Sequence, residues 1–407
     1  MGVHFHLRTL QDPPMTPQNK TLRFSMFALL YFTQGTILGY FASVNALYLM
    51  GSGFDMAKVG VFSTIALIPF VIKILFGMLS DRFNFLGLGH RKPYIFMGLA
   101  VQTLCLLIVA KINPADHYWG FVGIAFLLQL GMAFYDTCTD GLALDITPEH
   151  EQGILQGFMV GGRSVGVIAA ASAAGFIAQY LNWPSVFYFL AVLTLLPIPL
   201  LFFIKDTGRG TGIRFNWSAF KAFKNLQVIA AAAVGLIIFL VIVGANQLMN
   251  PALTERFNID LSTAGLLTTV WGLGCVGGAF IGGFLKDRLG DKTALWASVI
   301  TVIPAMLLLA FVGVKPLIWV VAVYFGLSYG MSQSIYFALA MKYTQPAIAA
   351  SMFAILMSVT NIGQGIGLGA GGALASKAGF PITFVIFGAL TLLVIPFFPV
   401  LFKKKTA

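Results

Sequence analysis

Apolar runs of about 20 residues, separated by short polar segments, follow one another from residue 25 to the end of the chain. An α-helix rises about 1.5 Å per residue, so such a run crosses a bilayer core about 30 Å thick. In lipid the backbone must satisfy its own hydrogen bonds, and residues 231–243 lack the alternation of barrel strands. We therefore predict an all-α membrane protein with twelve transmembrane helices, at residues 25–49, 58–79, 93–110, 119–144, 154–179, 184–204, 226–249, 262–285, 293–314, 317–340, 347–371 and 381–402.

The longest polar interruption divides the chain near its middle. It predicts an N-terminal six-helix bundle over 1–204, a cytoplasmic linker over 205–225 and a C-terminal six-helix bundle over 226–407. Aromatic residues recur every three positions in the linker, which favours a short helix on the membrane surface. A basic linker with some interfacial anchoring is preferred here over a regulatory element.

Composition and charge agree with this picture. The chain is 58% hydrophobic and 10% charged, whereas a soluble domain has about 25% charged residues, so most of its surface must face lipid. The net charge of +11 indicates topology and not a nucleic-acid partner, because Lys and Arg gather in the termini and after even-numbered helices. This positive-inside bias places both termini in the cytoplasm and the protein in the inner membrane. The opposite side holds only five such residues, Lys58, Lys111, Arg256, Lys315 and Lys377.

A loop motif occurs twice, once in each half. The pattern G-x-L-x-D-R follows the second and the eighth predicted helix, and its two aspartates are 206 residues apart. A repeat at half the chain length that keeps the membrane orientation indicates two parallel bundles. An Asp can cap a facing helix and an Arg can hold that Asp, so we expect the two loops to latch the halves together in one conformation. The latch residues are Gly77, Asp81, Arg82, Gly283, Asp287 and Arg288.

The paired motif resembles the loop signature of the major facilitator superfamily (MFS), and the resemblance covers essentially the whole chain. It implies a twelve-helix fold with a central cavity between two halves, and transport by alternating access. In this fold the first, fourth, seventh and tenth helices line the cavity.

Four charged side chains fall in the interior of predicted helices: Lys73, Asp136, Asp140 and Arg163. A charge in the membrane costs at least about 2.5–3.5 kcal/mol, so such residues usually pair and usually have a function. Asp136 lies eleven residues before the turn at 147–152 and Arg163 eleven after it, which places them at similar depth. We therefore predict a buried cluster of the four, with Asp136 paired to Arg163.

Two interpretations of the cluster remain open. One carboxylate can bind a transported proton, because two adjacent anions repel each other in a low dielectric. Alternatively, two acids and two bases cancel and form a structural network that never titrates. Binding of an anionic substrate by Arg163 is compatible with either interpretation.

Uncharged polar residues in the helices are candidate substrate contacts, although buried amides also join helices by hydrogen bonds. These candidates are Gln34, Asn45, Tyr135, Asn246, Gln247, Tyr329, Gln333, Tyr336, Asn361 and Gln364. The chain has no nucleophile–base–orienter set, no His or Cys metal spacing and no phosphate-binding loop motif. We therefore expect no enzymatic activity, no cofactor and no resident metal.

Within the superfamily, the N-terminal half resembles the branch of the AmpG-type muropeptide permeases and of the acetyl-CoA and folate–biopterin transporters. The resemblance rests on Lys73, on D-x-x-x-D-x-x-x-x-D at 136–145 and on G-R-x-x-G at 162–166. It implies a monomeric, proton-coupled importer of a small organic solute, which can be anionic. Residues 89–94 also resemble the PucC family, so the alternatives are a non-transporting assembly factor and an MFS exporter.

Overall fold

The computed structural model describes residues 20–73, 75, 76, 79, 91–147, 149–204, 206, 221, 224–343 and 349–402. Within these ranges the chain forms helices and no strands, which confirms the predicted all-α class. Eleven helices there are long and apolar enough to cross a membrane, and Met56–Val71 is a shorter apolar helix. The chain is a multi-pass membrane protein.

The N-terminal half contains the helices up to residue 203. These are α1 (Lys20–Ser43), α2 (Asn45–Gly51), α3 (Met56–Val71), α5 (Lys92–Val109), α6 (Tyr118–Ile146), α7 (Glu149–Tyr180), α8 (Trp183–Leu195) and α9 (Ile198–Phe203).

The C-terminal half begins at residue 226. Its helices are α10 (Leu226–Phe257), α11 (Leu261–Phe311), η3 (Lys315–Leu317), α12 (Ile318–Lys342), α13 (Ala349–Ala378), α14 (Phe380–Thr391), η5 (Leu392–Phe397) and α15 (Phe398–Leu401). The long α11 bends at Gly290, whose φ of 79° is accessible to glycine, and this bend separates two spans.

Two predicted spans are interrupted. The first is divided at Val44, where the backbone leaves the helical region between α1 and α2. The second ends as a regular helix at Val71, although the apolar run continues to residue 79. Pro69 lies two residues before this end, and a proline inside a helix has no N–H to donate to the carbonyl four residues earlier, which weakens the helix there.

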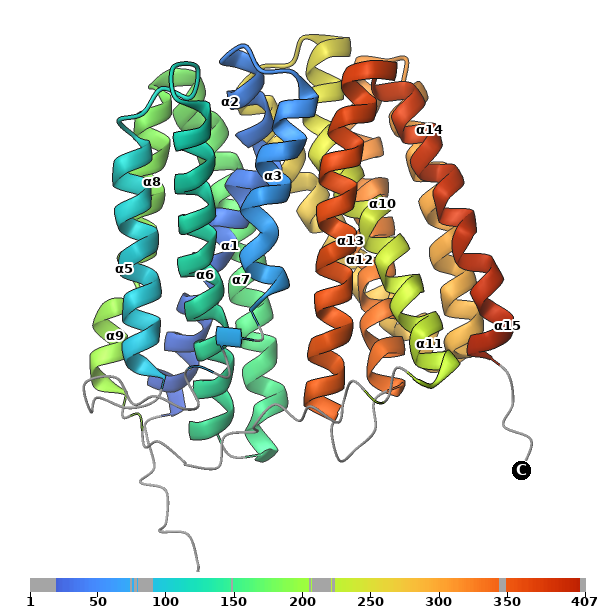
Figure 1. Ribbon diagram of the computed structural model, residues 1–407, viewed down its shortest axis with the longest axis horizontal. Helices are drawn as coiled ribbons and strands as arrows, with labels where there is room; N and C mark the ends of the chain where they lie inside the picture. Colours follow the sequence, from blue (N-terminus) through green and yellow to red (C-terminus); the bar gives the residue numbers. More distant parts are fainter. Residues whose placement is uncertain are drawn as a thin grey trace, which may run out of the picture.

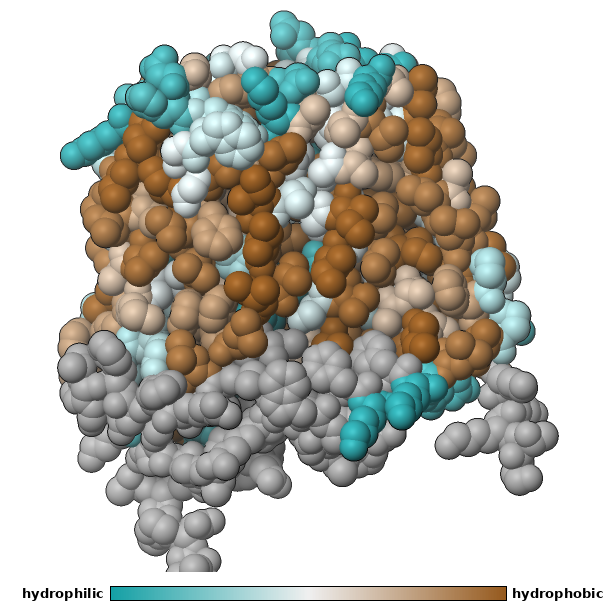
Figure 2. Space-filling view, viewed as in Figure 1, coloured by the Kyte–Doolittle hydropathy of each residue, from teal (hydrophilic) through white to brown (hydrophobic). Residues whose placement is uncertain are grey.

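The helices stand side by side, with the N-terminal half on one side and the C-terminal half on the other (Figure 1). The surface is hydrophobic over most of its height, and polar side chains gather at the upper end in this view (Figure 2). We call that end, where α3 begins, the Asp55 end, and the opposite end, where α7 begins, the Glu151 end.

Two glycine contacts join the halves, one between α3 and α13 and one between α7 and α11. A Cβ added at Gly60 would lie 2.7 Å from the carbonyl oxygen of Leu368, and one at Gly175 would lie 2.4 Å from that of Leu261. Both distances are too short for any side chain. Glycine is therefore what allows the backbones to approach this closely.

Hydrogen bonds close the same end of the interface. The Asn250 amide donates to the carbonyl oxygen of Ser43 at 2.6 Å, and the Ser376 hydroxyl donates to Asp55 at 2.9 Å. The backbone N–H of Leu261 donates to the side chain of Gln179 at 3.2 Å. The halves are thus closed at the Asp55 end.

The predicted linker is described only at its margins. Asp206 accepts hydrogen bonds from the backbone N–H groups of Arg91 and Lys92, at 2.8 and 3.0 Å, and so holds the start of the linker against α5. The predicted surface helix with Trp217, Phe220 and Phe223 lies outside the described residues.

Candidate functional site: a charge cluster between the halves

Asp136 on α6 is the centre of the cluster and is 5% exposed. Its Oδ2 lies 3.5 Å from the Lys73 ammonium, and its Oδ1 accepts a hydrogen bond of 2.6 Å from the Gln34 amide. Lys73 follows the end of α3 at Val71, so an irregular segment carries the cation to the acid. Non-helical backbone at membrane depth is tolerated where it is buried in protein or lines a cavity.

Asp140 lies one helical turn along the same face of α6. The Tyr31 hydroxyl donates a hydrogen bond to it. Tyr31 and Gln34 are themselves one turn apart on α1, so two donors on α1 match two acids on α6. Tyr31 was not among the predicted site residues, although its spacing of three from Gln34 could have indicated it.

Arg163 on α7 is exposed and forms no ion pair with a residue that the structure describes. Its charge interacts with Asp140 and Tyr31, and also with Tyr329 of the opposite half. The predicted pairing of Asp136 with Arg163 is therefore wrong, because Lys73 takes that place. Matching depths fix the height of a residue along a helix but not its direction around the axis.

Several polar residues of the C-terminal half bond within the protein. The Gln247 amide donates to the carbonyl oxygen of Leu368 at 3.1 Å. Asn361 donates to the carbonyl oxygen of Phe70 at 2.9 Å, and Gln364 donates to Asn361 at 3.0 Å. Asn361 thus crosses the interface and binds the last turn of α3, next to Lys73.

Other predicted substrate contacts have fewer hydrogen-bond partners within the protein. Tyr329 and Gln333 are half-buried on α12 and lie one turn apart. Gln333 has no hydrogen-bond partner among the described residues, and neither does the side-chain oxygen of Asn246. The role of these three residues as substrate contacts stays a prediction.

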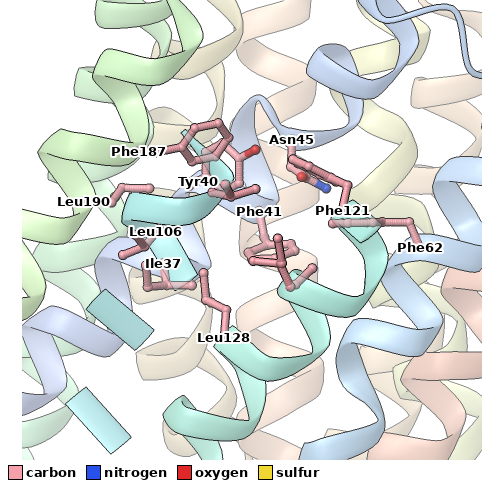
Figure 3. A pocket seen from close by; sticks show the side chains of 13 residues that line it. Ile37, Tyr40, Phe41, Asn45, Phe62, Leu106, Phe121, Leu128, Phe187 and Leu190 are labelled. Atoms are coloured by element: carbon pink, nitrogen blue, oxygen red, sulfur yellow. The ribbon is translucent and has the colours of Figure 1, made fainter. Parts of the chain in front are cut away.

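Asn45, Tyr135 and Tyr336 are packed within their own halves. Asn45 lines a small, mainly apolar pocket inside the N-terminal half, together with Tyr40 (Figure 3). Tyr135 is fully buried behind Gly98 on α5, and Tyr336 is buried against Gly235 on α10.

Trp271 on α11 was not among the predicted candidates. Its ring packs edge-to-face on Tyr329 at 5.0 Å, and its buried indole N–H has no partner among the described residues. A buried Trp usually finds a partner for its N–H. Its signal in the sequence is weak, because a Trp in an apolar run also fits simple packing.

The predicted latch can be followed only in part. Gly77, Asp81 and Arg82 lie outside the described residues, as does the side chain of Asp287. Arg288 lies over the ring of Phe284 at 5.6 Å, and an added Cβ at Gly283 would meet no atom within 4 Å.

The described residues contain no group of three His, Cys, Asp or Glu that could hold a metal ion.

The family follows from comparison with known proteins. The model of the Major Facilitator Superfamily matches residues 26–250 and 232–407. The chain belongs to the Major Facilitator Superfamily. The fold implied by the repeated loop motif is confirmed.

Several curated relatives of this MFS chain are named as transporters or permeases. It is 25% identical to the sialic acid transporter NanX of Escherichia coli over 59% of the chain and 58% of that protein, so the match spans little more than half the relative's length. It is 23% identical to the putative transporter AmpG 1 of Rickettsia bellii, over 86% of the chain and 90% of that protein. The anhydromuropeptide permease of E. coli is 23% identical over 46% of the chain and 36% of that protein.

Solved MFS structures share the fold. The nucleoside transporter NupG superimposes with a TM-score of 0.77 at 15% identity, over 95% of this chain and 99% of the other. A D-xylose–proton symporter superimposes with a TM-score of 0.73 at 16% identity, over 93% and 96%.

Proposed function

We propose that this MFS transporter imports a small organic anion by alternating access and couples that import to protons. The observation that carries the proposal is an exposed arginine without an ion-pair partner in the described chain, whose charge acts on Asp140 of the cluster and on Tyr329 of the opposite half. Ionisable residues inside a membrane protein usually mark the path of a solute or a proton.

The closed Asp55 end supports alternating access. The positive-inside bias puts the Glu151 end in the cytoplasm, so the described state is closed toward the outside. A transporter must visit a second state in which this end opens. The glycine contacts and hydrogen bonds there include no ion pair among the described residues, which keeps the cost of separating the halves low.

The chemistry of the solute follows from Arg163 and from the relatives. A guanidinium binds a carboxylate with two parallel hydrogen bonds. Sialic acids and muropeptides, the compounds for which two relatives are named, both carry carboxylates beside an amino sugar. Gln333 and Tyr329 would bind the hydroxyl or amide groups of such a solute from the other half.

Proton flux into proteoliposomes tests the proposal. The protein is reconstituted with a trapped pH-sensitive dye and offered sialic acid, anhydromuropeptides, neutral amino sugars, pterins and coenzyme A esters. We expect acidification with a carboxylated sugar, and loss of it in Arg163→Gln but not in the control Lys111→Gln, a charge change at the exposed Asp55 end. Silence across the panel with well-folded protein would favour a non-transporting assembly factor, and flux only with neutral sugars would overturn the role of Arg163.

A further inference from the structure

The two aspartates of the cluster differ in their partners. We propose that Asp140, and not Asp136, carries the transported proton, and that it takes up the proton when an anionic solute occupies Arg163. This inference rests on the proposed function and assigns separate tasks to its two acids.

Asp136 has a donor at each carboxylate oxygen. Its two carboxylate oxygens face two donors, the ammonium group of Lys73 and the amide of Gln34. A hydrogen bond or an opposite charge that binds the anion favours the anion. In this arrangement neither the Lys73 ammonium nor the Gln34 amide nitrogen can accept a hydrogen bond from a protonated Asp136, and protonation would leave the half-buried Lys73 without its anion.

Asp140 has a partner that suits both protonation states. Its hydrogen bond comes from the Tyr31 hydroxyl, which can donate to a carboxylate and can accept from a carboxylic acid. The charged and titratable groups that face Asp140 are Tyr31 on α1, Lys73 after α3, Asp136 on α6 and Arg163 on α7. Of the two cations, Lys73 already binds Asp136 and Arg163 lies beyond ion-pair distance.

Charge balance links this acid to the solute. Without a solute, two aspartates and two cations are neutral together. A bound carboxylate adds one negative charge, and an unbalanced charge in a low dielectric is costly. One proton from the adjoining water, added to a carboxylate oxygen of Asp140, restores neutrality. When the solute leaves, Arg163 again balances the ionised Asp140 and the proton departs with the solute.

Infrared spectroscopy tests the assignment without a known solute. Spectra of the protein in lipid nanodiscs are recorded as the pH is lowered, and the carbonyl stretch of a protonated carboxylic acid is followed. We expect a band in the wild type that disappears in Asp140→Asn and persists in Asp136→Asn. Tyr31→Phe should keep the band and shift its frequency, because the acid loses its hydroxyl partner.

The outcomes separate this inference from the proposed function. A band that is lost in Asp136→Asn and kept in Asp140→Asn would overturn the inference, as would a wild type without any such band. Neither result decides whether the protein transports a solute, because the flux assay in liposomes tests that separately. Asp140→Glu, which keeps the acid, controls for folding: its band should remain, and its thermal unfolding should match that of Asp140→Asn.

Discussion

At the scale of single residues, the Lys73–Asp136 pair shows how a charge is accommodated in this protein. Asp136 is buried, whereas the Lys73 side chain is 30% exposed, so the pair lies at the edge of the interior. Removing one member of a buried pair leaves the other desolvated and unpaired, which costs more than removing both.

Asp136→Ala should therefore destabilise the protein more than the double variant Asp136→Ala with Lys73→Met. We expect a difference of about 1–3 kcal/mol, the cost of an unsatisfied buried group. Thermal unfolding of the single and double variants in detergent, arranged as a double-mutant cycle, measures this difference. Additive effects would show that the two side chains do not interact.

Asp55 lies outside the membrane-spanning segments and responds to pH. The backbone N–H of Lys58, and then the Ser376 hydroxyl, hold the pKa of its carboxyl below the usual range. A carboxyl with a lowered pKa stabilises the bonded structure above its ordinary pKa, and that contribution is lost as pH falls through the lowered value. The Ser376 part exists only while α3 and α13 are together.

Acidification should therefore favour opening of the Asp55 end. Spin labels at the exposed positions Lys58 and Lys377 report the distance between α3 and α13, which is measured by double electron–electron resonance. We expect the long-distance population to grow as pH falls below about 4, near the ordinary pKa of an aspartate. Asp55→Asn should remove this dependence, and an unchanged dependence in that variant would assign it to another group.

The residue scale also shows what the sequence could predict of the site. Charge in an apolar run was enough to select Lys73, Asp136, Asp140 and Arg163. It could not select the partners, because these depend on the rotation of each helix about its axis. Asn361, predicted as a substrate contact, binds the carbonyl oxygen of Phe70, since a broken helix leaves an acceptor that the apolar pattern does not reveal.

At the scale of elements, the glycine contacts determine how the halves meet. The backbones of α3 and α13, and of α7 and α11, approach too closely at the Asp55 end for a side chain to fit. A larger residue there must displace a whole helix, because the neighbouring atoms belong to the backbone.

Gly60→Val and Gly175→Val should shift the protein toward a state open at the Asp55 end. The same pair of spin labels should show a longer distance in either variant than in the wild type. Gly123→Val on α6 is the matched control, since an added Cβ there meets no atom within 4 Å. An unchanged distance in both interface variants would mean that the helices adjust locally to the larger side chain while the Asp55 end stays closed.

Element boundaries show the limit of the hydrophobic pattern. The pattern located the spans, because length and apolarity determine which segments can cross a bilayer. It did not predict the breaks at Val44 and after Val71, because the hydrophobicity of a residue does not depend on whether its backbone is helical or irregular. Pro69 was a visible signal, yet prolines are common in membrane helices and often leave the helix continuous.

At the scale of the whole molecule, orientation in the membrane remains a prediction from charge. The excess of Lys and Arg after even-numbered helices predicts that both termini face the cytoplasm. A green fluorescent protein fused to the C-terminus should fluoresce in bacterial cells, whereas alkaline phosphatase at the same position should be inactive. The opposite pair of results would invert the assigned direction of transport.

The architecture as a whole was predictable because it is repeated. Two copies of one loop motif, half a chain apart, indicated two equivalent bundles, and the family match and the solved relatives agree. Which end is closed was not predictable. Both states of a transporter use the same apolar faces, so a hydrophobic pattern is compatible with either.

The early end of α3 has a consequence for the exchange of backbone hydrogens with solvent. Amides inside a long helix exchange slowly, while those at a break exchange fast unless something holds them. Here Asn361 of the other half binds the Phe70 carbonyl at the break, so the local exchange rate depends on whether the halves touch. Deuterium uptake around Lys73 should then be faster when the halves separate there, and mass spectrometry could follow that change in an unlabelled protein before its cargo is known.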